Sequence, residues 1–498
     1  WNWMETLFGV AIGACLGLGL WRNRDLITLR ETENATDRPL LPEAVAWTLL
    51  GVHGVMLLLA DFSPLRWARA IYDPGLAIAV VRRGELLVSR GFGAAELENR
   101  TPVTDATMFQ SGSLGKQFTA AGVLSLVEDE KIALDSSVRH YLPEVPASWQ
   151  PITIRHLLSH RGGVPDYTSD GFDYRKDYTD ADLIAMASAL PLEFPAGTRW
   201  NYSNTGYVML GIIITRVTGR PYDAFLRERI FTPAGMPTIR VITEADVVPN
   251  RAHGYLPTAS GWEHAAWVAP RLNTTADGSM LVSIRDLIAW NAVVSTRRLL
   301  RPESWTLMLS ASRLPTGRDY PYALGWFLGE AGGHPMQQHG GTWQGFVSQY
   351  TRFPDQELAV MVLSNARAMA PATLAMQVAA LYDSSLVPTP PPRATIPDRE
   401  PQATAAVQAI LTRVAAGSLA LEDFEVVRQT IFPRMRAALT ATVQGKGPLT
   451  RLELLARREV GDDVECAARA VAALQDLAGA LVELHHPLGV QQHPGLLR

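Results

Sequence analysis

The sequence of 498 residues predicts a layered α/β domain of the α+β type, an antiparallel sheet flanked by helices, over about residues 70–386. Two apolar runs at 75–81 and 85–93, joined by a tight turn, indicate a first hairpin. Strand-like runs at 322–329, 335–339, 345–353 and 358–365 indicate a late antiparallel meander, with "EAGGH", "GGTWQ" and "PDQE" as the turns between them. Hairpin and meander can join one sheet, and the patterns between them predict an all-helical middle region.

The helical patterns follow the first hairpin. The segment 112–131 predicts a helix with one apolar stripe, because apolar residues recur at spacings of three and four: Leu114, Phe118, Ala121, Leu124 and Val127. Further helices are predicted at 152–160, 204–219 and 283–294, and the second of these ends at Gly219.

Residues 1–61 contain two apolar segments, at 7–21 and 44–60, each somewhat shorter than the ~20 residues of a membrane-spanning helix. Tryptophans flank the first segment, and the connecting loop carries Arg22, Arg24, Arg30 and Arg38. If both segments span, that loop is cytoplasmic and the rest of the chain is extracytoplasmic, or periplasmic. The alternatives are buried or interfacial helices and a cytoplasmic protein.

The other boundaries lie in the second half of the chain. The predicted domain covers 62–387, a proline-rich linker follows at 388–401, and 402–498 forms a small C-terminal domain of uncertain fold. In that domain, 422–443 and 466–486 suggest helices, and 448–460 suggests a strand between them.

Composition excludes several classes of function. A net charge of −4 gives no reason to expect a nucleic-acid partner. Cys15 and Cys466 lie at opposite ends of the chain, which indicates neither a disulfide framework nor a zinc site.

Lysine is rare in this chain. Of 45 basic residues four are lysines, and Lys116 follows Ser113 by one helical turn. A serine hydroxyl needs a nearby base to become a nucleophile, and lysine can serve where arginine cannot, because arginine is effectively always protonated. A helix start also offers free N–H groups for an oxyanion. The competing interpretation is a helix-capping serine beside a solvated lysine, since Ser-x-x-Lys also arises by chance.

Two further patterns bear on this chemistry. Tyr202 and Asn204 flank Ser203 directly before an apolar helix. Tyr202 can transfer a proton if neighbouring cations lower its pKa, and Asn204 can hydrogen-bond a substrate. A run between strand-like segments allows close approach of a substrate to the backbone: His339, Gly340, Gly341 and Thr342. Each pattern is weak by itself, and His160-Arg161-Gly162 also matches the second.

The order Ser-x-x-Lys, Tyr-x-Asn, His-x-Gly resembles the serine β-lactamase-like family, which includes class C β-lactamases, DD-peptidases, related esterases and D-amino-acid peptidases. The resemblance covers about residues 73–366 and includes "TMFQSGSLGKQFTA", "ITIRHLLSHRGGVPDY", "PAGTRWNYSNTGYVMLGIII" and "HGGTWQGF". In this family "LLSHRGG" occupies a structural turn, which argues against His160 as the third motif.

The resemblance implies a β-lactamase/transpeptidase-like fold and two-step acyl transfer. Ser113 would form an acyl-enzyme, Lys116 and Tyr202 would share the base and acid roles in either order, and Asn204 would orient the substrate. The N–H groups of Ser113 and Thr342 would form the oxyanion hole. It implies a small-molecule or peptide substrate and no metal or organic cofactor, and it leaves the oligomeric state open.

One departure concerns specificity. Family members that act on β-lactams usually carry a lysine where this chain has His339, so we hypothesise weak β-lactamase activity and a preference for other amides or esters. The alternatives are a β-lactamase, a non-catalytic penicillin-binding-like sensor or binding module on the same fold, and an α/β-hydrolase. The last is disfavoured because Ser111 replaces the first glycine of Gly-x-Ser-x-Gly.

Overall fold

The computed structural model describes, apart from a few single residues, the ranges 73–168, 172–243, 245–278, 280–387, 401–420, 449–460, 463–472 and 481–486. The apolar segments at 7–21 and 44–60 and most of the proline-rich run lie outside the described residues. Within the described ranges, no helix has both the length and the apolar character that a bilayer crossing requires.

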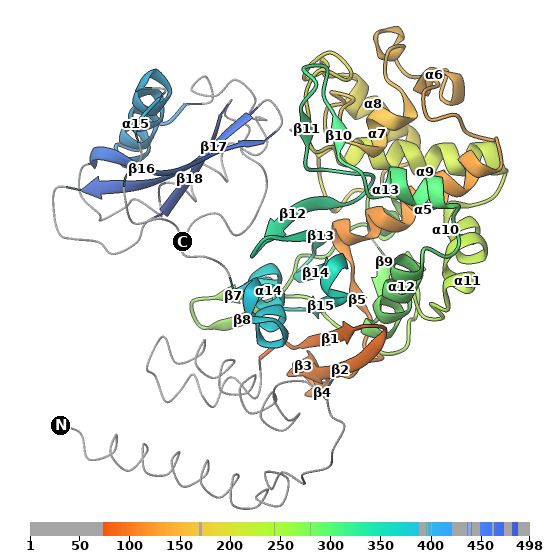
Figure 1. Cartoon of the computed structure of the whole chain (residues 1–498). Coiled ribbons are helices and arrows are strands. Elements are labelled where there is room, and N and C mark those ends of the chain that lie inside the picture. Colours follow the sequence, from red (N-terminus) through yellow and green to blue (C-terminus); the bar gives the residue numbers. More distant parts are fainter. Residues whose placement is uncertain are drawn as a thin grey trace, which may run out of the picture. The chain divides into compact units, whose positions relative to one another are not determined.

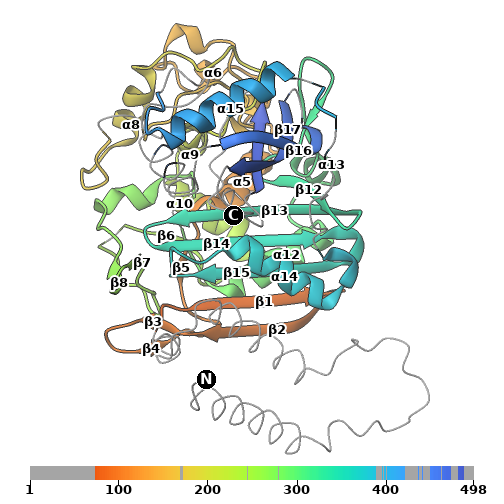
Figure 2. The ribbon, with the colours of Figure 1, turned by 90° about the vertical axis from the view of Figure 1, so that its left-hand side faces the viewer.

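One antiparallel sheet of six strands organises the region between residues 73 and 387 (Figure 1). Figure 2 shows its strands in the order β12, β13, β14, β15, β1, β2. Their bounds are β1 Leu76–Arg82, β2 Glu85–Phe92, β12 Phe327–Ala331, β13 His334–Trp343, β14 Phe346–Phe353 and β15 Leu358–Ser364. The pairing of β1 with β15, in which Val80 lies opposite Val360, confirms that the first hairpin and the late meander share one sheet.

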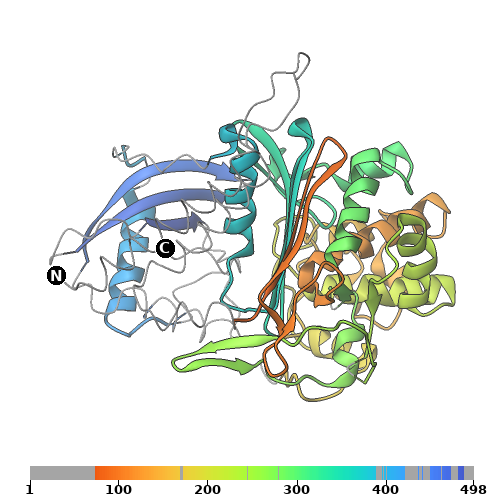
Figure 3. The ribbon, with the colours of Figure 1, turned by 90° about the horizontal axis from the view of Figure 1, so that it is seen from below.

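Helices cover both faces of this sheet. Helix α14 (Pro371–Tyr382) contacts β14 and β15, while α12 (Ile284–Thr296) contacts β15 and β1 on the opposite face (Figure 3). Every residue of β14 and β15 is buried, which explains the nearly continuous apolar sequence of β15.

Helix α5 (Lys116–Glu128) lies in the core and follows the 3₁₀ turn η1 (Gly112–Gly115). The sequence predicted one apolar stripe, but the first eleven residues of α5 are all buried, because neighbours surround it. Phe118, for example, contacts Phe231 and Trp290 edge-to-face, at ring separations of 5.6 and 5.0 Å. The helix is therefore a rigid base for the turn that carries Ser113.

The middle of the chain is mostly helical, but the prediction of an all-helical region is wrong, because short strands also occur there. Its helices are α6 Val138–Tyr141, α7 Ile154–Leu158, α8 Asp180–Ser188, α9 Asn204–Thr218, α10 Tyr222–Leu226, α11 Thr232–Ala234 and α13 Pro302–Met308. Short strands connect them: β3 Ala94–Glu96, β4 Thr101–Pro102, β5 Phe109–Gln110, β6 Arg240–Val241, β7 Tyr255–Thr258, β8 Gly261–His264, β9 Met280–Val282, β10 Ser312–Arg313 and β11 Asp319–Tyr320. Helix α9 begins after the N-cap Ser203 and ends at Gly219, whose φ of +68° suits glycine.

Two sequence interpretations need correction. The segment "GGTWQ" was predicted to be a turn, but β13 continues to Trp343, because Gly340, Gly341 and Thr342 pair with β14. The helix expected over 466–486 is wrong where the structure describes it: these residues lie in β17 (Asp463–Ala472) and β18 (Leu481–His486).

The C-terminal segment contains α15 (Pro401–Ala415) and an antiparallel sheet in the order β16, β17, β18. The strand predicted at 448–460 is present as β16 (Leu449–Val460). Every second residue of β17 from 464 to 470 is apolar, which is the period of a strand: Val464, Cys466, Ala468 and Ala470. Pairing on both sides of β17 outweighs the weak preference of alanine for helices.

Candidate active site

Ser113 lies in η1 between strand β5 and helix α5. Its Oγ atom accepts a hydrogen bond from Lys116 Nζ at 3.1 Å, so the predicted spacing of one turn brings the two side chains together. Ser113 is partly exposed, whereas Ser111 is completely buried and donates to the carbonyl oxygen of Gly278 at 2.5 Å. Ser111 therefore holds the turn against a neighbouring loop, and Ser113 is the serine that a substrate can reach.

Lys116 is completely buried, and its ammonium group makes two further hydrogen bonds. Nζ donates to Asn204 Oδ1 at 2.9 Å and to the carbonyl oxygen of Asp277 at 2.5 Å. Burial lowers the pKa of Lys116 from 10.5 to about 8, although the charges of Asp277 and Asp166 act in the opposite direction. About a tenth of this side chain is thus the neutral amine at pH 7, and the neutral share rises steeply toward pH 8.

Tyr202 lies over the same group. Lys116 Nζ is 4.8 Å from the centre of its ring. Proton transfer by Tyr202 was predicted on the condition that neighbouring cations lower its pKa, but burial raises this pKa well above its usual value, while the neighbouring Ser113 hydroxyl acts in the opposite direction. The phenol is therefore protonated at neutral pH and suits an acid better than a first base.

Asn204 is the first residue of α9 and is fixed by a buried carboxylate. Its backbone N–H and its Nδ2 both donate to Asp166 Oδ2, at 3.0 and 3.2 Å. This arrangement directs Oδ1 toward Lys116. The structure thus gives the Asn204 amide a role in orienting Lys116, whereas the sequence suggested contact with the substrate.

Strand β13 passes directly beside η1. Strand β12 pairs with β13 only from His334 to Gln338. The residues of β13 after Gln338 therefore have no β12 partner, and β13 contacts η1 instead. A Cβ atom on Gly341 would lie 2.0 Å from the carbonyl oxygen of Ser111 and 2.8 Å from the nitrogen of Ser113. A Cβ atom on Gly112, whose φ is +52°, would lie 2.4 Å from the nitrogen of Thr342. The backbones of Ser113 and Thr342 are therefore close neighbours.

His339 and Gly340 precede this contact on β13. The His339 side chain is buried, its Nδ1 lies 2.6 Å from the Gly340 carbonyl oxygen, and its Nε2 lies 3.3 Å from the hydroxyl of Tyr322. Gly340 lies against β14, where a Cβ atom would meet Gln349 Oε1 at 2.7 Å.

A chain of hydrogen bonds links His339 to His160 through Tyr322. The Ser203 N–H donates to His160 Nδ1 at 3.1 Å, and His160 Nε2 lies 3.0 Å from the Tyr322 hydroxyl. With both histidines neutral, His160 donates to Tyr322, Tyr322 donates to His339, and His339 donates to Gly340. The His160 ring also packs on Tyr202 at 4.1 Å. His160 is thus outside the third motif, as expected, but contacts the site.

Three of these residues were not predicted from the sequence. Asp166 and Tyr322 act through side chains, and the run "GGVPDY", which contains Asp166, was noted only as part of the family resemblance. Asp277 contacts Lys116 through its backbone carbonyl oxygen, and because every residue has this group, the sequence cannot indicate such a contact. The Asp277 side chain accepts a hydrogen bond from the Tyr167 hydroxyl at 3.0 Å.

The segment 166–180, which leads into α8, also contributes to this region. Tyr174 from this segment contacts Trp343, at the end of β13, with ring centres 6.0 Å apart. Residues 169–171 of the segment lie outside the described part.

Comparison with known proteins places this geometry in context. The family model described as Beta-lactamase matches residues 66–382, well over half of the chain. Penicillin-binding protein 4* of Bacillus subtilis is 30% identical over 299 residues, which cover 57% of this chain and 66% of that protein. A D-aminopeptidase of Gluconobacter oxydans is 28% identical over 331 residues, covering 65% of this chain and 61% of that protein. The chain therefore spans just under two thirds of the length of these curated relatives.

A solved structure shares the fold. The octameric penicillin-binding protein homologue from Pyrococcus abyssi matches with a TM-score of 0.59 and 21% identity, over 89% of this chain and 96% of that one.

Proposed function

The chain belongs to the Beta-lactamase family, and from this premise we propose that it is a serine hydrolase that cleaves an amide or ester bond through an acyl-enzyme on Ser113. The observation that carries the proposal is the contact between Lys116 and Ser113. A fully buried amine with a pKa of about 8 lies 3.1 Å from a partly exposed serine hydroxyl. This is the arrangement that an activated serine nucleophile requires.

In the proposed first step, neutral Lys116 accepts the Ser113 proton while Oγ attacks the carbonyl carbon of the substrate. The N–H groups of Ser113 and Thr342 stabilise the oxyanion. Tyr202, protonated because its pKa is raised, donates a proton to the leaving group and recovers one from Lys116. Water then attacks the acyl-enzyme, with the same groups acting in reverse.

Asn204 acts on Lys116 in this proposal. Its Oδ1 and the Asp277 carbonyl oxygen hold Nζ beside Ser113, and Asp166 fixes the Asn204 amide. The carboxylates of Asp277 and Asp166 both raise the pKa of Lys116. Burial lowers this pKa by more than they raise it, and the result is a pKa of about 8. Asn204 is therefore a positioning residue for the base.

The environment of His339 supports a preference for substrates other than β-lactams. The ring is buried, and the hydrogen-bond chain through Tyr322 is complete with His339 uncharged. A neutral histidine offers no fixed positive charge to the carboxylate of a penicillin. We therefore propose esters and amides, including peptides with an N-terminal D-residue, as the preferred class; the latter follows the D-aminopeptidase relative.

A fluorophosphonate probe and a substrate panel test the proposal. We expect the probe to label the full chain and Ser111→Ala, but not Ser113→Ala. The panel contains p-nitrophenyl esters, D-alanine p-nitroanilide and nitrocefin, and we expect kcat/KM to be lowest for nitrocefin. Absence of labelling in folded protein would favour the binding module, and nitrocefin turnover equal to the best ester would favour a β-lactamase.

Attachment to a membrane is a separate proposal that rests on the sequence of residues 1–61. We propose an extracytoplasmic catalytic domain. Cell fractionation of the full chain and of a chain beginning at residue 62 tests it, because only the full chain should remain with the membrane fraction after a high-salt wash.

A further inference from the structure

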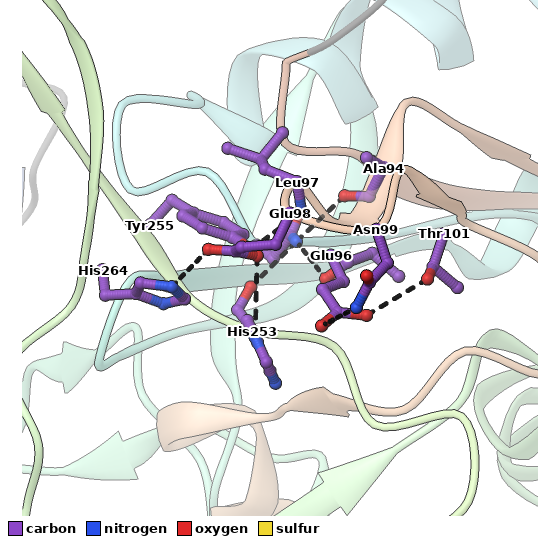
Figure 4. Close-up of polar contacts among 11 residues, drawn as sticks. Ala94, Glu96, Leu97, Glu98, Asn99, Thr101, His253, Tyr255 and His264 are labelled. Carbon is purple, nitrogen blue, oxygen red and sulfur yellow. Dashed lines mark hydrogen bonds and ion pairs between the residues drawn. The ribbon is translucent and has the colours of Figure 1, made fainter.

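Three side chains that can bind a metal converge away from the serine site (Figure 4). Glu98 lies between β3 and β4, His253 lies two residues before β7, and His264 is the last residue of β8. One ligand atom from each of the three side chains lies within 4.8 Å of the other two. Segments far apart in the sequence thus bring two imidazoles and one carboxylate together.

The spacing of these atoms is close to that of a coordination shell. His264 Nε2 contacts Glu98 Oε1, and His253 Nδ1 lies 4.0 Å from Glu98 Oε2. Ligand atoms around a tetrahedral zinc ion are about 3.3 Å apart, given metal–ligand bonds of about 2.0–2.1 Å. Each of the three side chains is about half exposed, so small rotations suffice to reach that spacing.

Neighbouring groups hold the ligands in place. The Tyr255 hydroxyl donates to Glu98 Oε2 at 2.7 Å and accepts from the Leu97 N–H at 2.9 Å, and the Tyr255 ring is buried. Such a hydrogen bond to a ligating carboxylate is usual in metal sites, where it fixes the orientation of the ligand.

The backbone that carries the two histidines is fixed as well. The His253 N–H donates to the Ala95 carbonyl oxygen at 2.9 Å, and Asn365 Nδ2 donates to the His253 carbonyl oxygen at 2.9 Å. His264 lies opposite Tyr255 in the β7–β8 hairpin.

We propose that Glu98, His253 and His264 form a binding site for a divalent transition-metal ion of the zinc type, with a fourth position open to water. Two imidazole nitrogens favour zinc over calcium or magnesium, which prefer oxygen ligands. The ion would link the β3–β4 connection to the β7–β8 hairpin. The competing explanation is a surface ion pair between Glu98 and protonated histidines, which binds no metal.

Calorimetric titration with zinc chloride separates the two explanations. The full chain, purified without a histidine tag and treated with a chelator, should bind one zinc ion. The His253→Ala/His264→Ala variant should raise the dissociation constant by more than about 100-fold, and Tyr255→Phe by about tenfold, since a supporting group is worth 10–100-fold. Both substituted histidines are exposed enough for the variant to fold, and its melting temperature should equal that of the metal-free wild type.

His334 supplies a matched control. Its Nδ1 lies 2.7 Å from Asp355 Oδ2, so it is also a histidine–carboxylate pair on the surface of the catalytic region. His334→Ala should leave zinc binding unchanged. Equal affinity in the wild type and the double histidine variant, or no binding by the wild type at millimolar zinc (about the affinity of the weakest biological metal sites), would overturn the proposal.

Discussion

The burial of Lys116 explains why this position carries one of four lysines in a chain with 45 basic residues. A buried amine can lose its proton near neutral pH, whereas a guanidinium stays charged in the same place. The contacts to Asn204 and to the Asp277 carbonyl oxygen keep Nζ beside Ser113 in either protonation state.

Lys116→Arg should therefore lower kcat by about 10²–10⁴-fold, the usual contribution of a positioned base. Lys131→Arg, a substitution at an exposed lysine, should leave kcat unchanged. Steady-state kinetics on the best ester measures both, with near-ultraviolet circular dichroism to verify folding. Activity of Lys116→Arg within a small factor of wild type would exclude Lys116 as the base.

The pKa of Lys116 also predicts a pH profile. Burial lowers this pKa to about 8, so the neutral amine predominates above pH 8 and the inactive ammonium below it. We expect kcat/KM for a p-nitroanilide to fall by about tenfold per pH unit below pH 8 and to be level above it, because one deprotonated group is needed. A profile that is already level from about pH 6 would mean that another group accepts the first proton.

Tyr322 is the centre of the hydrogen-bond chain between His160 and His339. Tyr322→Phe leaves one nitrogen of each buried histidine without its partner, which should cost about 1–3 kcal/mol in the free energy of unfolding. Because His160 packs on Tyr202, kcat/KM should fall as well.

Tyr141→Phe is the comparison for Tyr322→Phe, since the Tyr141 hydroxyl only accepts from the Ala133 N–H, remote from the serine. Urea unfolding should show a loss of stability in both variants, while kinetics should show a loss of activity for Tyr322→Phe alone. Equal kcat/KM values for the two variants would show that the hydrogen bonds through Tyr322 do not contribute to catalysis.

Site residues could be predicted from the sequence where they lie within a few residues of one another, and not where only the fold brings them together. Ser113 and Lys116 are one turn apart, and Tyr202 and Asn204 are two residues apart, so local sequence carries their proximity. Asp166 and Tyr322 join the site only through contacts across the fold, and Asp277 joins it through a main-chain carbonyl.

At the scale of elements, apolar runs separated by turn residues predicted the sheet well, and local composition misled in two places. Glycines in β13 suggested a turn, although pairing with β14 keeps this segment extended. Alanines in β17 suggested a helix, although two neighbouring strands pair with it. Both errors arise where partners distant in sequence decide the conformation.

The close approach of β13 to η1 predicts the effect of a single methyl group. Gly341→Ala would place Cβ 2.0 Å from the Ser111 carbonyl oxygen, and the strand must move away from the serine turn. Displacement of about 1 Å in such a site can cost about 10²-fold in rate.

Gly329→Ala on the adjacent strand β12 is the matched control. There the Cβ would meet only the flexible end of Met336, at 3.1 Å. We expect kcat/KM to fall for Gly341→Ala and to stay near wild type for Gly329→Ala, with both variants folded by circular dichroism. The same kcat/KM in both variants would contradict a role for the β13–η1 contact.

At the scale of the whole molecule, the hydrophobic core and the site belong to one part of the chain. The members of the main core cluster all lie between Ala77 and Leu363, and the proposed site residues lie between Ser113 and Thr342. Helix α14 completes this part by burying Ala375, Val378 and Ala379 above β14 and β15.

A fragment of residues 62–387 should therefore unfold in one cooperative transition and hydrolyse the best ester with a kcat/KM close to that of the full chain. A fragment of residues 62–369 keeps all six strands but lacks α14, and it should fail to fold because the apolar face of β14 and β15 loses its cover. Thermal unfolding and ester hydrolysis of the two fragments measure this difference. An insoluble or inactive 62–387 fragment would show that residues beyond 387 contribute to the fold or to the site, and a folded 62–369 fragment would show that α14 is dispensable.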